Sequence, residues 1–101
     1  MLFDWDPKKN EILKATRNIS FEAIVVHLGR GDVWRVADHP DQEKHPKQQL
    51  IFVIVNDYVY IVPFEIRGDS MWLVTIIPSR KATKEYQKEK TNEIDRRRKR
   101  N

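Results

Sequence analysis

The chain has 101 residues, no cysteine, 19 Lys+Arg against 15 Asp+Glu, and 40% hydrophobic residues. This length corresponds to one small domain, and the missing cysteines exclude disulfides, thiolate metal sites and thiol nucleophiles. No apolar run approaches the ~18 residues of a membrane span, and residues 1–6 lack the order of a signal peptide, so we expect a cytoplasmic protein with no membrane partner.

The N-terminal part predicts a short strand at residues 2–5 and then a helix over residues 7–17. Asp6 and Pro7 form a good helix start, because the carboxylate can cap free amides and proline suits the first helical position. We expect this helix to end at Asn18, whose short polar side chain tolerates a turn.

A second helix follows, with Ser20 as its N-cap. Its apolar residues recur at helical spacing and mark a buried face: Phe21, Ile24, Val25 and Leu28. Gly29 and Gly31 should end it, because glycine readily leaves the helical conformation.

The middle of the chain predicts strands. After a strand at residues 33–36 comes a polar loop at 38–49, and three β-rich runs then form an antiparallel meander at residues 50–55, 58–66 and 71–77. Pro63 cannot donate to a ladder, so it needs a bulge or a place where its nitrogen faces away from a neighbouring strand. The fold class is α+β, with the two helices on one sheet face and the last helix on the other.

Ser79 can cap a final helix from about Arg80, with only its first two turns docked. Residues 1–80 hold 10 basic and 11 acidic side chains, whereas residues 81–101 hold 9 basic and 4 acidic. We expect a single domain at residues 1–90 and a basic, disordered tail at 91–101, which either attracts phosphates or only keeps the chain soluble.

Two histidines, His39 and His45, share the polar loop with three carboxylates, at Asp38, Asp41 and Glu43. Such residues can hold a metal ion, but their spacing matches no helix-based ligand pattern, and a polar loop collects them anyway. The three glycines form no phosphate-binding loop. We therefore expect neither a metal nor a cofactor.

The start of the last helix gathers cations beside free helix amides, which is a ready anion site. Cleavage of RNA through the 2′-hydroxyl needs a base, a proton donor and a cation. The candidates are Glu65 for the base, Tyr86 or Lys81 for the donor, and Arg80 for the cation. The candidate RNA-binding residues are Arg67, Lys81 and Lys84. Alternatively the cations only decorate a helix start, where they are mildly unfavourable.

Three segments together resemble the BrnT-like toxins of bacterial type II toxin-antitoxin pairs: Phe3-Asp4-Trp5-Asp6, Ile19-Ser20-Phe21-Glu22-Ala23, and Ile76 to Thr83 with its R-K-A-T ending. The resemblance implies a RelE-like fold, ribonuclease activity that arrests translation, and a ribbon-helix-helix antitoxin as partner. The chain departs from that family at residues 16–18, where members often carry Lys-His-Gly, and at Thr75, where they often carry arginine.

Three functions follow from these patterns. The first is a toxin that cleaves RNA by metal-independent acid/base chemistry and is held inactive by an antitoxin, which would bury Trp34 and Trp72. The second is a non-catalytic module that binds nucleic acid or an acidic protein through the same basic surface. The third is a structural protein-interaction domain. The sequence leaves open whether the chain forms a homo-oligomer.

Overall fold

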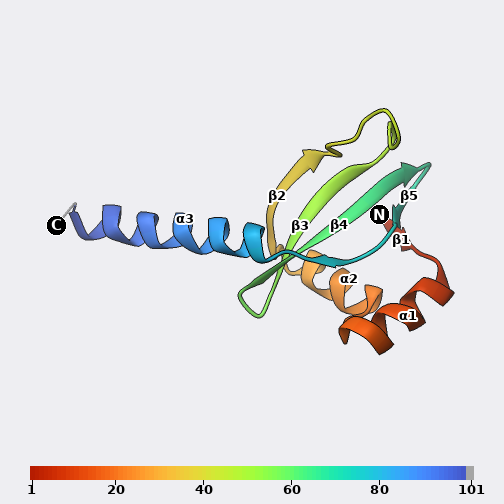
Figure 1. Cartoon of the computed structure of the whole chain (residues 1–101), viewed down its shortest axis with the longest axis horizontal. Coiled ribbons are helices and arrows are strands. Elements are labelled where there is room, and N and C mark those ends of the chain that lie inside the picture. Colours follow the sequence, from red (N-terminus) through yellow and green to blue (C-terminus); the bar gives the residue numbers. More distant parts are fainter. Residues whose placement is uncertain (100–101) are drawn as a thin grey trace.

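The computed structural model describes the backbone of residues 1–99 and the side chains of residues 1–98. Its elements in chain order are β1 (Leu2–Asp4), α1 (Pro7–Arg17), α2 (Phe21–Gly29), β2 (Val33–Asp38), β3 (Gln49–Val55), β4 (Tyr58–Arg67), β5 (Ser70–Leu73), β6 (Ile77–Pro78) and α3 (Arg80–Lys99) (Figure 1). The predicted α+β class is confirmed. Helices α1 to α3 do not combine the length and apolar character that crossing a bilayer needs.

The predicted helix boundaries near the N-terminus are confirmed by their capping contacts. The Asp6 carboxylate accepts a hydrogen bond from the Lys8 amide at 2.9 Å, and Asn18 ends α1 in the left-handed conformation at φ 52°. The Ser20 hydroxyl accepts from the Ala23 amide at 3.1 Å at the start of α2. These short polar side chains satisfy amides that the first helical turn leaves without partners.

The strands form one mixed sheet in the order β1-β5-β4-β3-β2, and β6 pairs with β4 beside β5. The predicted meander is the antiparallel series β3, β4 and β5, while β1 joins the outer edge of β5 as a parallel strand. The last strand predicted for the meander, residues 71–77, is two short strands in the structure, with a break at residues 74–76.

Pro63 explains that break. The Pro63 carbonyl accepts from the Val74 amide at 2.8 Å, so this side of β4 faces the segment that joins β5 to β6. A residue in an antiparallel ladder directs its nitrogen and its carbonyl to the same side, and proline has no N–H to donate there. The proline thus stands where the ladder is interrupted, and the segment that passes it continues into the buried Ile76.

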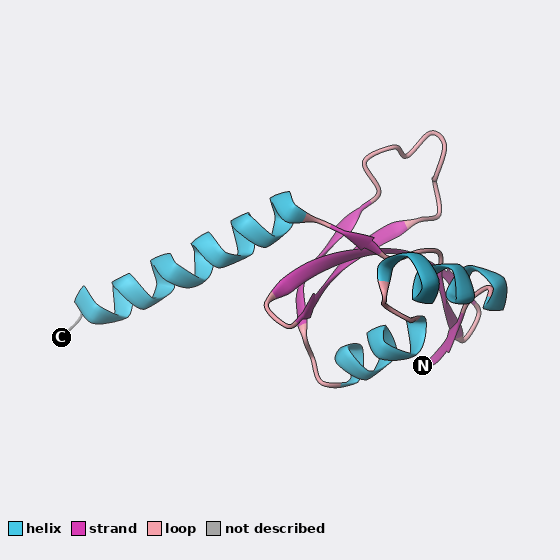
Figure 2. Ribbon diagram, turned by 60° about the horizontal axis from the view of Figure 1, so that its bottom comes forward, coloured by secondary structure: helices cyan, strands magenta, loops and turns pink. Residues whose placement is uncertain are grey.

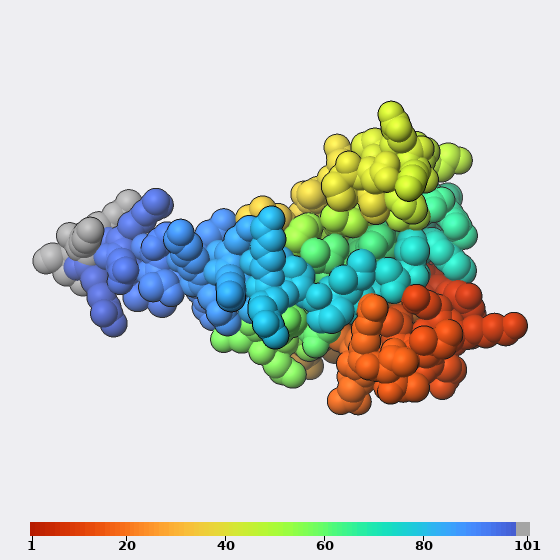
Figure 3. Space-filling view, viewed as in Figure 1, coloured from red at the N-terminus to blue at the C-terminus, as the bar shows by residue number. Residues whose placement is uncertain are grey.

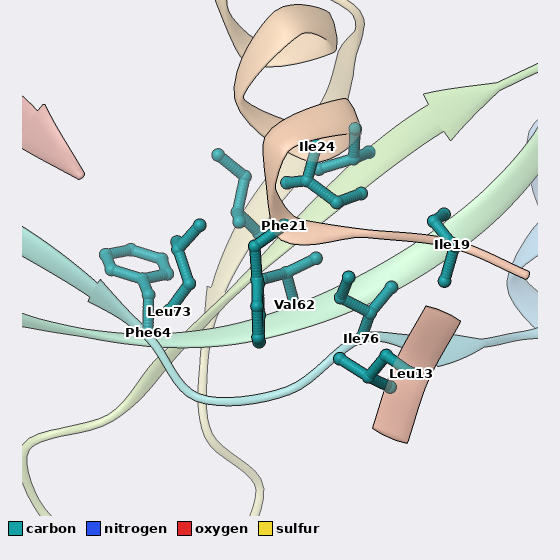
Figure 4. Packing of buried hydrophobic residues seen from close by; sticks show 10 residues of the cluster. Leu13, Ile19, Phe21, Ile24, Val62, Phe64, Leu73 and Ile76 are labelled. Atoms are coloured by element: carbon teal, nitrogen blue, oxygen red, sulfur yellow. The ribbon is translucent and has the colours of Figure 1, made fainter. Parts of the chain in front are cut away.

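The core lies between the sheet and the pair α1 and α2, which both cover the same sheet face (Figure 2). Figure 4 shows how the side chains of these helices interlock with those of the sheet. The cluster of buried residues is Leu13, Ile19, Phe21, Ile24, Ile51, Val53, Val62, Phe64, Leu73 and Ile76. Fully burying one such side chain contributes about 1.5–3 kcal/mol to folding. This one cluster of buried side chains, between the sheet and the two helices, therefore holds the domain together.

Helix α3 meets the other sheet face only at one end. The Val59 amide donates to the Thr83 hydroxyl oxygen at 2.9 Å, and that hydroxyl donates to the Ser79 carbonyl at 2.7 Å. Val59 and Thr83 are buried there, whereas the C-terminal half of α3 leaves the body of the molecule (Figure 1). The structure therefore confirms that the first turns of the last helix dock, and α3 covers the second sheet face only there.

The disordered tail predicted at residues 91–101 is helical in the structure as far as Lys99. Residues 91–99 contain neither proline nor glycine, and a Glu93–Arg97 ion pair of 3.0 Å, four residues apart, stabilises the exposed helix. Residues 100 and 101 of the predicted tail lie outside the described part of the chain.

We predict that Thr83→Val lowers the free energy of unfolding by about 1–3 kcal/mol, because the buried Val59 amide loses its acceptor without a change in side-chain volume. Urea denaturation measures this loss. Thr91→Val is the matched control, because the Thr91 hydroxyl also bonds one turn back on α3 but is exposed. Equal stability of the two variants would contradict the role given to Thr83.

A buried asparagine joins α1 to α2. The Asn10 side-chain amide donates to both carboxylate oxygens of Glu22 at 2.8 and 2.9 Å, and its oxygen accepts from the Phe21 amide at 2.9 Å. The Asn10 hydrogen bond holds the pKa of the Glu22 carboxyl below its ordinary value. The charged carboxylate therefore stabilises the fold.

Because the pKa of Glu22 is lowered by folding, its stabilisation is present above the ordinary carboxylate pKa of about 4.3 and is lost as pH falls through the lowered value. We predict that Glu22→Gln is less stable than the native chain at pH 7 and that this difference shrinks toward pH 3 in urea denaturation. The exposed Glu43→Gln is the control. A difference independent of pH would refute the assignment.

Candidate nucleic-acid interface

The structure does not bring Glu65 and Arg80 together. Pro78 of β6 pairs with Tyr60 of β4, five residues before Glu65. At about 3.3 Å per residue these five steps span about 16 Å, and the antiparallel direction of β6 takes Arg80 farther from Glu65. The expected convergence of a base and a cation is therefore wrong, because the β6–β4 register places them toward opposite ends of β4.

The third candidate catalytic residue, Tyr86, lies in yet another environment. Its ring packs edge-on against Trp34 of β2, with the ring centroids 5.9 Å apart. Tyr86 follows Ala82 by one helical turn, so it is on the face of α3 that is turned toward the sheet. The three side chains proposed as base, donor and cation thus do not form one site.

Arg67 also stands apart from the cations of α3. Its guanidinium stacks over the Trp72 ring at 4.4 Å and pairs with Glu65 at 3.5 Å, at the β4–β5 end of the sheet. Of the candidate RNA-binding residues, only Lys81 and Lys84 remain with Arg80 on one element. These last three residues follow the Ser79 cap directly, where Ser79 Oγ accepts from the Ala82 amide at 3.0 Å.

Helix α3 presents four exposed cations on one side, which we call the α3 cationic face: Arg80, Lys81, Lys84 and Lys88. Positions 80, 84 and 88 follow one another at four-residue steps, and position 81 is adjacent. The buried Ala82 and Thr83 point to the sheet and so fix this face toward solvent. The sequence prediction missed Lys88, although its spacing from Lys84 could have indicated it.

Two charged residues of α3, one acidic and one basic, pair with the sheet. Glu89 accepts from the Trp34 indole at 2.8 Å and pairs with Arg35 at 3.3 Å, while Lys90 pairs with Asp57 at 3.2 Å. The Asp57 carboxylate raises the pKa of Lys90. Within the described side chains, the four cations of the α3 cationic face form no ion pair.

A β-bulge gives the sheet-facing side of α3 its partners. The β2–β3 register pairs Val33 with Val53 and Arg35 with Phe52, so Trp34 is the extra residue. A bulge redirects a side chain across the sheet. Trp34 thereby reaches α3, and the Arg35 guanidinium stacks on the Trp34 ring at 3.6 Å. The side of α3 that carries Glu89 is thus occupied, whereas the α3 cationic face is exposed.

The polar loop forms internal contacts. The rings of His39 and His45 are 4.4 Å apart, and His39 Nδ1 accepts from the Asp41 amide at 3.0 Å. Within the described residues, no group of three or more histidine and carboxylate side chains is arranged to hold a metal ion. The loop contacts account for the position of these histidines without a ligand.

Comparison of the chain with models of protein families, with curated proteins and with solved structures found no match.

Proposed function

We propose that this protein binds RNA through the α3 cationic face. The observation that carries the proposal is the alignment of Arg80, Lys81, Lys84 and Lys88 on one exposed side of a helix. Two of that helix's acidic residues, Glu89 and Glu93, pair with Arg35 and Arg97. Cations in the first turns of a helix oppose its dipole. A bound phosphate offsets that cost, which supports a functional reason for their placement.

The shape of the molecule suits this role. Figure 3 shows α3 as an arm that leaves the body. From Arg80 to Lys88 the helix rises about 12 Å, so the four cations can follow a run of successive phosphates. Each phosphate that a cation neutralises releases condensed counterions, which favours binding without reading the base sequence.

We predict that replacing Lys81, Lys84 and Lys88 together by glutamine weakens RNA binding and flattens its salt dependence. The slope of log affinity against log salt should fall by about two units, at about 0.7 per phosphate on a single strand. Fluorescence anisotropy with labelled RNA, measured over a series of salt concentrations, gives both quantities.

The matched control changes three exposed lysines elsewhere, Lys8, Lys44 and Lys47, to glutamine. Its net charge equals that of the test variant, so a general charge effect would weaken both proteins alike. Equal loss of affinity in the two triple variants would refute a specific role of α3.

The second candidate is the toxin of a type II toxin-antitoxin pair. It is favoured by the order of a short strand, two helices, a meander and a final helix, and by the cations at the R-K-A-T segment that opens α3. The chain would then be a RelE-like ribonuclease that works in the cytoplasm and is neutralised by a ribbon-helix-helix antitoxin. The two tryptophans that an antitoxin would bury are both half-buried in the structure. Trp34 contacts α3, and the Arg67 guanidinium stacks on the Trp72 ring.

If the protein cleaves RNA, the geometry separates the roles of two candidate residues. We predict that Arg80→Ala lowers the cleavage rate by roughly 100-fold through lost charge stabilisation. Glu65→Ala should leave the rate unchanged, because Glu65 is far from α3. Gel analysis of RNA fragments, with and without ribosomes, measures both. Intact RNA under all these conditions would reject the ribonuclease candidate and leave RNA binding unaffected.

A further inference from the structure

A hollow of about 510 Å³ opens between the end of α1, the start of α2 and the β3–β4 hairpin. Its lining residues are Lys14, Arg17, Asn18, Ile19, Ser20, Ala23, Val55, Asn56 and Tyr60. The volume lies within the ~300–1,000 Å³ range of small-molecule sites. Neither the sequence motifs nor the proposed RNA binding by the α3 cationic face gives this hollow a role.

The hollow has an apolar bottom and a polar edge. Ile19 is buried and Ala23 and Val55 are half-buried, whereas the polar lining residues of α1 and the hairpin turn are exposed. Two of these, Asn18 and Asn56, adopt left-handed backbone conformations at φ 52° and 51°. Two tight turns therefore frame the hollow, and each is defined by its own backbone geometry.

Arg17 supplies a cation that is fixed by a hydrogen bond but forms no ion pair among the described side chains. Its guanidinium donates to the Ile76 carbonyl, and within the described side chains it pairs with no carboxylate. Lys14, in contrast, pairs with Glu11 at 3.1 Å. A guanidinium has five N–H donors in a planar fork, so most of those on Arg17 remain for a phosphate.

Tyr60 supplies a half-buried aromatic wall. Its ring meets the Tyr58 ring edge-on with the centroids 5.5 Å apart, which fixes its orientation. An aromatic ring beside an arginine is the pair of groups that stacks a nucleobase and holds its phosphate, and it does so for any base. The hollow thus presents complementary groups to one nucleotide of an unpaired strand.

The hollow lies close along the backbone to the start of α3. Tyr60 pairs with Pro78, and Arg17 bonds to Ile76, while α3 begins at Arg80. Arg80 follows Ile76 by four backbone steps, which at about 3.3 Å each span at most about 13 Å. A strand that leaves the hollow can therefore reach the cations of α3 within two or three nucleotides.

We infer that this hollow binds one nucleotide of a single-stranded polynucleotide, with the base on Tyr60 and a phosphate on Arg17. The inference rests on the proposed nucleic-acid binding by α3 and adds a selectivity to it. A base in a duplex is stacked and paired, so it cannot enter the hollow, whereas the α3 cationic face contacts phosphates of either form.

The test measures anisotropy with three labelled probes of about 10 nucleotides, within the usual 4–16-nucleotide site size: an RNA strand, a DNA strand of the same sequence and an RNA duplex. Tyr60→Leu should lower affinity for the RNA strand by roughly 5- to 100-fold and leave duplex affinity unchanged. Tyr60→Phe keeps the ring and should bind as the native protein does.

Arg17→Gln should weaken binding of the single strand by about tenfold, with Arg30→Gln as its control because Arg30 is exposed at the far end of α2. Because the Arg17 side chain is exposed, we expect Arg17→Gln to fold. This variant therefore tests the inference even if a thermal scan shows that Tyr60→Leu is unstable. If the protein binds the RNA and DNA strands equally, the hollow contacts only the base and the phosphate. If it prefers the RNA strand, the hollow also contacts the ribose.

Unchanged affinity of Tyr60→Leu and Arg17→Gln for the RNA strand would overturn this inference. If the triple lysine variant still lost affinity in that case, the proposed function of α3 would stand. A native protein that binds none of the three probes at low salt would overturn both.

Discussion

The orientation of the last helix depends on one polar contact between that helix and the sheet. The Ser79 amide donates to the Val59 carbonyl at 3.0 Å, and the Val59 amide donates to the Thr83 hydroxyl oxygen at 2.9 Å. A buried amide without a partner is costly, so this bond requires Thr83 to face β4. Once Thr83 faces inward, the helical period places Lys84 and Lys88 outward. The Thr83 hydroxyl, together with the Glu89 and Lys90 pairs, thus sets the direction of the charges.

The same attachment pairs two charged residues of α3 with the sheet. Glu89 and Lys90 find partners on β2 and on the hairpin turn, so their charges are paired at the sheet. The cations on the outer side find none within the described side chains. A surface ion pair contributes little stability, at most about 1 kcal/mol. The Glu89–Arg35 pair has a local consequence instead, because it keeps the Glu89 carboxylate at the sheet and away from the α3 cationic face.

Pro63 has an effect that reaches beyond its own strand. Because the ladder beside it is interrupted, the chain between β5 and β6 departs from regular pairing and buries Ile76. The Ile76 carbonyl is then free of the ladder and accepts from Arg17 of α1. The end of the first helix and the start of the last helix are in this way held at the same end of the sheet. The hollow beside Tyr60 lies at that end of the sheet.

Local chemistry made several elements predictable from the sequence. Capping by Asp6 and Ser20, the turn at Asn18 and the spacing of apolar residues in α2 depend only on neighbours a few residues away. The three strands of the meander carried enough β-rich residues to be recognised. The cations of α3 could be counted, and their docked first turns were expected from Ala82 and Tyr86.

The sequence by itself determined the α+β class, the helix starts and the surplus of positive charge at the C-terminal end, because each of these is a property of short segments. Only the tertiary structure decided that Glu65 and Arg80 lie apart, that a bulge sends Trp34 to α3, and that Arg17 meets Ile76. The reason is that strand register and long-range hydrogen bonds are set by the packing of segments distant in sequence, and a one-residue shift would change every neighbour.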